Sequence, residues 1–86
     1  MLYTILTNRD QYVVDILKPI TYDVDSCQHN YNDIIFANFD INLIKDTYTI
    51  IIENYNGLNL LIKPSKIELQ DNNCVISVEN IDVLPF

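Results

Sequence analysis

The sequence is poor in the residues that build ligand-binding loops and membrane spans. Its 86 residues include one glycine, no tryptophan, two cysteines and five basic side chains. A single glycine cannot make a glycine-rich phosphate-binding loop, so we exclude nucleotide sites of that kind. No apolar run approaches the roughly 18 residues that a membrane-spanning helix needs, so we expect no membrane association. The apolar residues 1–7 have neither a basic segment before them nor a small-residue cleavage site after them. We therefore expect no secretory signal and a cytoplasmic location.

Acidic residues dominate the charge. Twelve Asp and Glu stand against five Lys and Arg, which gives a formal charge of −7 at pH 7. A surface of this sign repels phosphates, so we expect neither direct nucleic-acid binding nor attachment to anionic membranes. Because 49% of the residues are hydrophobic, the chain should fold rather than stay disordered. We expect residues 1–86 to form a single compact acidic domain.

Strand-forming residues are abundant. The chain contains 14 isoleucines and six tyrosines, both of which favour β-strands. Apolar and polar residues alternate along 47–52, 58–63, 66–70 and 74–79, which is the pattern of half-buried strands. Short strands separated by tight turns predict an all-β fold, or a β-rich α+β fold with one short helix. The expected architecture is a small antiparallel barrel or sandwich built from hairpins.

Register decides the turn in the first hairpin of the second half. A two-residue Asn-Gly turn would mix the two faces, whereas a three-residue loop, 55–57, pairs Ile52 with Leu60 and keeps them apart. The loop also places Gly57 where a left-handed backbone is required. We therefore predict the three-residue loop, with Ile50 opposite Ile62.

The second hairpin is treated in the same way. A two-residue turn at Asn72-Asn73 places Leu69 opposite Ile76, and Ile67 opposite Val78. Asparagine tolerates the left-handed backbone that such a turn requires. Pro64-Ser65 is predicted to join the two hairpins, because proline cannot donate a hydrogen bond within a central strand. A last short strand is predicted from Ile81 to Leu84.

The first half of the chain leaves alternatives open. Residues 12–16 and 20–24 are predicted to form a hairpin around 17–19, and the alternative is one long strand bent at Pro19. Residues 26–33 are polar and are expected to form a loop. Residues 34–44 fit the period of a helix as well as that of a strand, and we expect at most one short helix there.

Cys27 and His29 form the only close pair of thiol and imidazole in the sequence. Their spacing matches no paired zinc frame, and no glycine-rich oxyanion loop accompanies a Cys–His nucleophile. The segment from Asp23 to Ile34 lacks the glycine and the glutamate of an EF-hand. Cys74 alternates in phase with apolar residues, so we expect it to be buried and unbonded, a Cys27–Cys74 disulfide being the less favoured alternative. We expect no metal, no cofactor and no enzymatic activity.

The acidic residues are the remaining candidates for function. Strand parity places Asp15, Asp23 and Asp25 on one solvent face, and Asp33 and Asp40 lie in the segment that follows. These carboxylates either keep the protein soluble or meet a basic partner. Two tyrosines are expected to be exposed and to serve as partner-binding anchors, and these are Tyr31 and Tyr55.

Only the general character of the chain resembles known proteins. Short length, acidity, an Ile/Asn/Tyr bias and the lack of catalytic motifs resemble the small accessory proteins of bacteriophages and mobile elements. That group includes inhibitors of host defence nucleases, such as anti-CRISPR proteins and uracil-glycosylase inhibitors. The resemblance covers no motif and carries over no residue.

These observations favour a non-enzymatic protein-binding module. The leading hypothesis is a phage or mobile-element inhibitor, such as an anti-CRISPR-type protein, acting in the host cytoplasm. It would block a basic, nucleic-acid-binding site of a host defence protein as a monomer or homodimer. One alternative is a structural or assembly subunit of a phage virion or tail, built through edge strands. A third is an immunity protein or antitoxin that neutralises a basic toxin.

Overall fold

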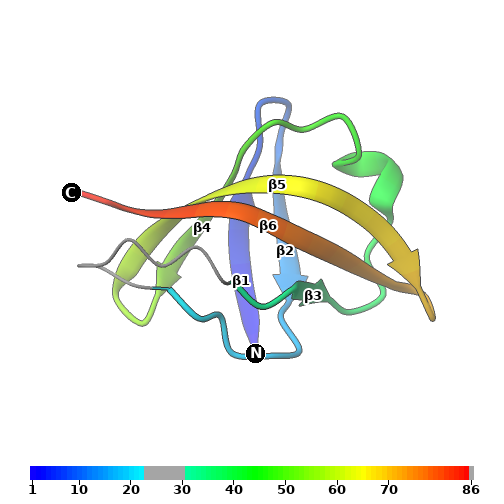
Figure 1. Cartoon of the computed structure of the whole chain (residues 1–86), viewed down its shortest axis with the longest axis horizontal. Coiled ribbons are helices and arrows are strands. Elements are labelled where there is room, and N and C mark those ends of the chain that lie inside the picture. The colour runs from blue at the N-terminus through cyan, green and yellow to red at the C-terminus, as the bar shows by residue number, and fades with distance from the viewer. Residues whose placement is uncertain (23–30, 86) are drawn as a thin grey trace.

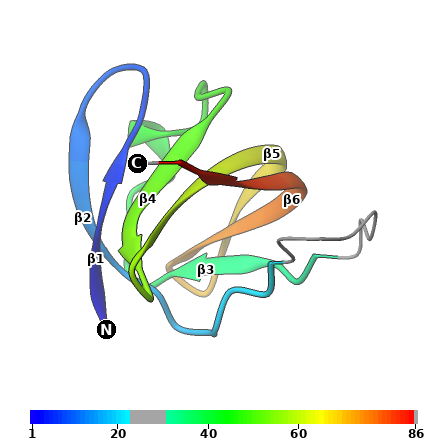
Figure 2. The ribbon, with the colours of Figure 1, turned by 90° about the vertical axis from the view of Figure 1, so that its left-hand side faces the viewer.

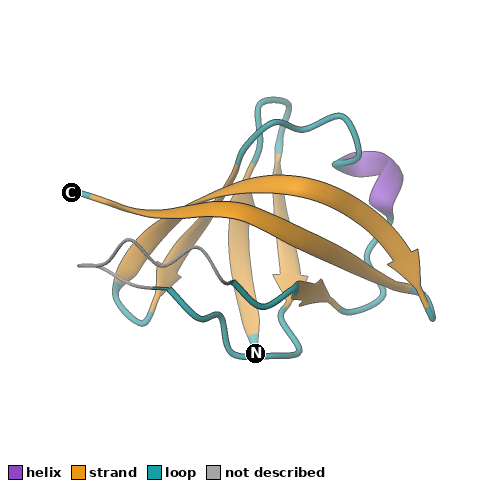
Figure 3. Ribbon diagram, in the orientation of Figure 1, coloured by secondary structure: helices purple, strands orange, loops and turns teal. Residues whose placement is uncertain are grey.

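The computed structural model describes residues 1–22 and 31–85, which form one antiparallel six-stranded sheet (Figures 1 and 3). The strands are β1 (Leu2–Leu6), β2 (Gln11–Asp15), β3 (Ile34–Phe36), β4 (Ile50–Tyr55), β5 (Leu58–Gln70) and β6 (Asn73–Leu84). Their order across the sheet is β2-β1-β4-β5-β6-β3. The helical content of the described ranges is one 3₁₀ turn, η1 (Ile41–Leu43). The all-β prediction is confirmed.

The sheet curls into a half-barrel because its two edge strands meet at one end (Figure 2). Ile16, the residue after β2, forms an isolated antiparallel bridge with Phe36 of β3. Beside this bridge the Ala37 N–H donates a hydrogen bond of 2.8 Å to the Asp15 carbonyl. Nearer the N-terminal end of β2, no neighbouring strand pairs with its outer edge in the described part of the chain. The barrel is therefore closed at one end of β2 and open along the rest of it.

Inward-facing side chains from all six strands form the core. The largest fully buried side chains are Phe36, Ile5, Ile34, Ile44, Ile50, Ile52, Leu60, Ile62, Ile76 and Cys74. Each buried Ile or Leu stabilises the fold by about 1.5–3 kcal/mol relative to an exposed one. Cys74 is a free, buried thiol, as predicted, and burial raises the pKa of this thiol to about 11. Cys27 and His29 lie outside the described residues.

The first two strands pair with each other, which corrects the prediction for residues 12–24. β2 forms a hairpin with β1, in which Leu2 lies opposite Asp15. The Thr7 hydroxyl accepts hydrogen bonds from the amides of Arg9 and Asp10 and so holds the turn. Residues 20–22 belong to no strand, and β2 ends before Pro19, so neither the predicted hairpin nor the single bent strand forms.

The β4–β5 hairpin has the predicted register but a different turn. Ile50 lies opposite Ile62 and Ile52 opposite Leu60, as expected. The turn itself, however, contains only Asn56 and Gly57, both at positive φ (52° and 83°). The extra residue lies in a β-bulge between Ile52 and Tyr55 rather than in the loop. A bulge and a longer loop shift the register equally, so the pattern of apolar residues could not distinguish them.

The predicted register of the β5–β6 hairpin is wrong by two residues. The turn is Asp71-Asn72, both at positive φ, and Leu69 lies opposite Cys74 instead of Ile76. Ile67 accordingly lies opposite Ile76. A shift of two residues keeps every side chain on its face, so face parity allows both turns. Residues 71–73 are Asp, Asn and Asn, which tolerate a left-handed backbone, so the sequence allowed either two-residue turn.

Pro64 does not separate two strands as predicted. β5 runs through it, and the pairing with β6 shifts register on both sides of Pro64. The pairing of β5 with β4 ends at Ile62. Pro64 has no N–H to donate, but it lies beyond this pairing, so no β4 carbonyl loses a hydrogen bond. The predicted last strand, Ile81 to Leu84, is the end of the long β6. Figure 1 shows the resulting β5–β6 hairpin arching across the sheet.

Residues 34–44 contain a strand followed by one helical turn. β3 pairs with β6 over three residues, and η1 follows after an Asn38 at positive φ. The expectation of at most one short helix is confirmed. The two periods that the sequence shows in this segment belong to two successive elements.

Candidate partner-binding site

The structure brings together only some of the predicted site residues that it describes: Tyr31 and Asp33 line one groove and Tyr55 lines an adjoining one, whereas Asp15 and Asp40 line neither. Asp23 and Asp25 lie outside the described residues, so their predicted place beside Asp15 is not seen. Asp33 precedes β3, and Asp40 lies beyond β3 at the start of η1. Within residues 1–22 and 31–85, no three His, Cys, Asp or Glu side chains come together as a metal site requires.

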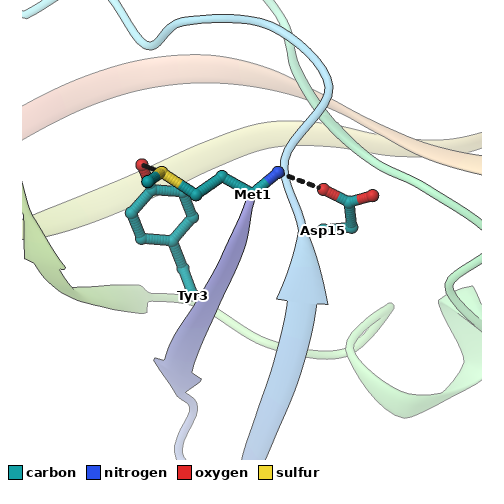
Figure 4. A network of polar contacts seen from close by, with 3 residues as sticks. All are labelled: Met1, Tyr3 and Asp15. Atoms are coloured by element: carbon teal, nitrogen blue, oxygen red, sulfur yellow. Dashed lines mark hydrogen bonds and ion pairs between the residues drawn. The ribbon is translucent and has the colours of Figure 1, made fainter.

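Asp15 lies at the end of β2 and is paired with the start of β1. Its Oδ1 lies 2.7 Å from the α-amino nitrogen of Met1, and its side chain is partly exposed (Figure 4). On the other side of Met1, the Tyr3 hydroxyl contacts the Met1 sulfur at 3.1 Å. The carboxylate therefore has a local cationic partner, which reduces the charge that it offers to another protein.

Asp40 has a structural role. It is the N-cap of η1, and its Oδ1 accepts a 2.9 Å hydrogen bond from the Asn42 N–H. A side-chain oxygen at this position satisfies an amide that the helical turn leaves without a partner. The sequence places Asp40 three residues before Leu43 at the end of η1, so the cap could have been predicted once the helical turn was located.

Tyr55 is buried, which contradicts the predicted exposure. Only 6% of the residue is accessible, and its hydroxyl accepts a 2.7 Å hydrogen bond from the Ile20 N–H. The ring centroids of Tyr3 and Tyr22 lie 5.0 and 6.3 Å from that of Tyr55. Simple alternation from Ile52 would turn residue 55 outward, but the bulge reverses the alternation and turns it inward. Tyr55 thus joins β4 to the segment that follows β2.

Tyr31 is half-buried rather than fully exposed. It packs against the core, and its hydroxyl donates a 3.4 Å hydrogen bond to Asn80 Oδ1 in β6. The tyrosine that is largely exposed is Tyr48, at 81%. Tyr48 lies in the loop before β4, where the alternation of residues 47–52 placed it on a strand.

Three shallow grooves join at one end of the half-barrel. The largest, about 600 Å³, is lined by Lys18, Pro19, Thr21, Tyr31, Asn32 and Asp33. The second, about 260 Å³, is lined by Met1, Tyr3, Ile16, Leu17, Lys18, Pro19 and Tyr55. The third, about 370 Å³, is lined by Met1, Leu2, Tyr3, Thr4, Glu53 and Asn54. The first two share Lys18 and Pro19, and the last two share Met1 and Tyr3. We call this continuous surface the groove end.

The groove end forms because β1 and β4 separate there. β1 and β4 pair only where Ile5 and Leu6 meet β4, which leaves the N-terminal part of β1 separated from the bulge at Glu53 and Asn54. Pro19 keeps the chain after β2 out of the sheet, so this segment forms a wall instead of a strand. Sequence reasoning missed Lys18 and Glu53, although Pro19 signalled that the strand would end nearby.

Carboxylates without a local partner lie mainly at the groove end. Twelve acidic residues minus Asp23 and Asp25 leave ten in the described ranges. Seven of these have an ion pair or a hydrogen bond, and they are Asp10, Asp15, Asp40, Asp46, Glu68, Glu79 and Asp82. Among residues 1–22 and 31–85, no such partner is found for Asp33, Glu53 or Asp71. Asp33 and Glu53 line the first and third grooves.

Three exposed ion pairs lie away from the groove end. Ion pairs join Arg9 to Asp46 at 3.6 Å, Lys63 to Glu79 at 3.9 Å and Lys66 to Glu68 at 3.4 Å. All of these side chains are substantially exposed, so each pair contributes only about 0–1 kcal/mol. Two of them balance charge on the β5–β6 hairpin, and the third joins the β1–β2 turn to the segment before β4.

Comparisons with protein-family models, with curated proteins and with solved structures found no match to this chain. Within the described residues no helix is long and apolar enough to cross a membrane.

Proposed function

We propose that this chain is a non-enzymatic protein-binding module whose groove end meets a basic partner. The observation that supports this most is the position of Asp33 and Glu53, which line two of the three grooves and have no ion pair within the part of the chain that the structure describes. A carboxylate of this kind can accept paired hydrogen bonds from an arginine of another protein. The formal charge of −7 would also attract a basic partner over a longer distance.

The kind of partner follows from the charge. A site that binds the phosphates of a nucleic acid is rich in Lys and Arg, and carboxylates can occupy it in place of phosphates. We propose that the chain acts as an inhibitor of this type, encoded by a phage or mobile element, in the host cytoplasm. Its target would be the nucleic-acid-binding site of a host defence protein, as for an anti-CRISPR-type inhibitor.

A second candidate function rests on a different observation. Among the described residues no strand pairs with the outer edge of β2 over most of its length, and small β domains assemble through such edges. A structural or assembly subunit of a virion or tail would use this edge. Such a subunit would form higher oligomers whose stability depends little on the groove-end carboxylates.

The test compares two double variants that remove the same charge. Asp33→Asn with Glu53→Gln neutralises the groove end, whereas Glu79→Gln with Asp82→Asn neutralises two carboxylates on β6. Each immobilised protein is incubated with host lysate at low and at high salt, and the retained proteins are compared with those of the wild type. We expect a basic protein that is retained at low salt, is released at high salt and is lost only from the groove-end variant.

Two results would contradict the proposal. Equal loss from both variants would mean that diffuse attraction by net charge, rather than the groove end, retains the partner. Retention by both variants would leave Asp33 and Glu53 as part of a solubilising surface. Thermal unfolding of all three proteins checks that they fold, and we expect nearly equal melting temperatures because these side chains lie at the surface.

A further inference from the structure

We propose that the groove end selects a partner segment in which an acidic side chain lies between two arginines, an inference that rests on the proposed function. The first observation is a cation within this surface. Lys18 lines both the first and the second groove, whereas Asp33 lines only the first and Glu53 only the third. Because the second groove connects the other two, the charges follow one another in the order negative, positive, negative. A uniformly basic partner would be repelled at the centre, and a partner carboxylate opposite Lys18 removes that repulsion.

Lys18 is held in place by the residues on either side of it. The Leu17 N–H donates to the Ile35 carbonyl at 3.0 Å, and the Ile20 N–H donates to the Tyr55 hydroxyl at 2.7 Å. A proline follows Lys18 directly and restricts its backbone to extended conformations. The backbone that carries the ammonium group is therefore fixed before a partner arrives, which reduces the entropy lost on binding.

Lys18 has no carboxylate partner among residues 1–22 and 31–85. The four ion pairs found there involve other cations. Asp33 lines the first groove together with Lys18, yet the two side chains form no ion pair. Lys18 is exposed, so its ammonium group can bind a carboxylate of another protein.

A tyrosine accompanies each of the two groove-end carboxylates. Tyr31 lines the first groove with Asp33, and Tyr3 lines the third groove with Glu53. Both tyrosines are half-buried, so part of each side chain remains accessible. An arginine can donate paired hydrogen bonds to a carboxylate and stack its planar guanidinium on an aromatic ring, whereas lysine has no planar group. The two outer grooves therefore favour arginine over lysine.

Peptides of equal composition test the order of the charges. One peptide carries arginine, glutamate and arginine in this order, and the other carries arginine, arginine and glutamate. Both have the same Gly-Ser spacers, and each order is made with spacers of several lengths. NMR titration of the folded protein measures the dissociation constants and the amides that shift. At the best spacer length we expect the first peptide to bind roughly two- to fivefold more tightly, as one additional exposed ion pair provides, and to shift residues 18, 33 and 53.

Two variants with the same change of charge isolate the effect of Lys18. Lys18→Glu should abolish the preference for the first peptide, because it places a carboxylate opposite the glutamate of that peptide. Lys45→Glu, at an exposed position that lines none of the three grooves, should retain the preference. Both variants attract basic peptides more strongly through net charge, so the ratio of the two dissociation constants is compared. Melting temperatures close to that of the wild type show that both variants fold.

A further peptide tests the choice of arginine. Replacing both arginines of the first peptide by lysines should weaken its binding to the wild type roughly threefold or more, because the paired hydrogen bonds and the stacking are lost. Equal binding of the arginine and lysine peptides would overturn the assignment of the outer grooves to arginine.

Other results would overturn the selection by Lys18. These are equal binding of the two charge orders, a preference that survives in Lys18→Glu, and the absence of any shift at millimolar peptide. Binding of a basic partner at the groove end would still stand if Asp33→Asn with Glu53→Gln weakens the binding of both peptides. If that double variant binds both peptides as tightly as the wild type does, the groove end is not the binding surface, and the proposed function fails as well.

Discussion

Two stretches of sheet edge in this molecule differ in their protection. On β5, the stretch beyond the last pairing with β4 contains Lys63, Pro64 and Lys66, and its register shifts twice there. On β2, the stretch away from the Ile16–Phe36 bridge has two valines and none of these features. Proline, lysine and bulges all hinder pairing with another strand. The β5 edge is therefore protected against pairing with another strand, and the β2 edge lacks these protections.

The same contrast appears in the charges of the two hairpins. The β5–β6 hairpin carries exposed ion pairs between Lys63 and Glu79 and between Lys66 and Glu68. The β1–β2 hairpin has ion pairs at its two ends, Met1 with Asp15 and Arg9 with Asp46, and it also exposes the apolar Leu2 and Val13. The acidic character of the whole chain thus conceals a neutral, apolar region, which average composition does not reveal.

The largest expected effect on the free energy of unfolding comes from truncating a buried apolar side chain, and truncating an exposed one of similar size is its control. Ile62→Ala in β5 should lower the free energy of unfolding by about 2–5 kcal/mol, because Ile62 is fully buried and the surroundings cannot fill the cavity. Leu2→Ala in β1 should lower the stability of the monomer by less than about 0.5 kcal/mol, because Leu2 is 69% exposed. Urea unfolding at low protein concentration measures both. Similar losses would mean that Leu2 packs against something within the monomer.

An intermediate effect is expected at the β4–β5 turn. Gly57 has a φ of +83°, and a Cβ placed there would meet no atom within 4 Å, so any cost is conformational. Gly57→Val should destabilise the protein by about 1–2 kcal/mol, since a β-branched residue strongly disfavours this backbone. Gly57→Asn should cost less, because asparagine tolerates positive φ, as Asn56 does next to it. Equal melting temperatures for the wild type and Gly57→Val would contradict this account of the turn.

The smallest effect is expected at the ion pairs of the β5–β6 hairpin. Replacing Lys63 by Met should change the free energy of unfolding by less than about 1 kcal/mol, because both Lys63 and Glu79 are exposed. A double-mutant cycle with Glu79→Gln isolates the interaction between the two side chains. A coupling well above 1 kcal/mol would show that charge balance on this hairpin stabilises the fold, and not only its surface properties.

Sequence alone predicted the class of the fold and the faces of its longest strands. Alternation identified the inward positions of β4 and β5, and it predicted the burial of Cys74. It failed where parity carries no information. The Asp71-Asn72 turn and the predicted turn one residue later bury the same faces, and only the structure distinguishes them.

The candidate site was less predictable because it depends on contacts between distant segments. The bulge before Tyr55 reverses the alternation, so the tyrosine expected at the surface binds the backbone of Ile20 instead. β1 was missed as a strand, and with it the groove between β1 and Glu53. Asp40 was predicted as a site residue from its charge alone, yet its carboxylate caps η1. Composition does not show which carboxylates already have local partners.

Hydrogen exchange at the amide of Val13, measured in dilute solution, tests the open edge of β2 most directly. We expect this amide to exchange rapidly, whereas the amide of Ile76, in a strand flanked by β5 and β3, should stay protected. Exchange at Val13 that is as slow as exchange at Ile76 would contradict the description of β2 as a strand with an open outer edge.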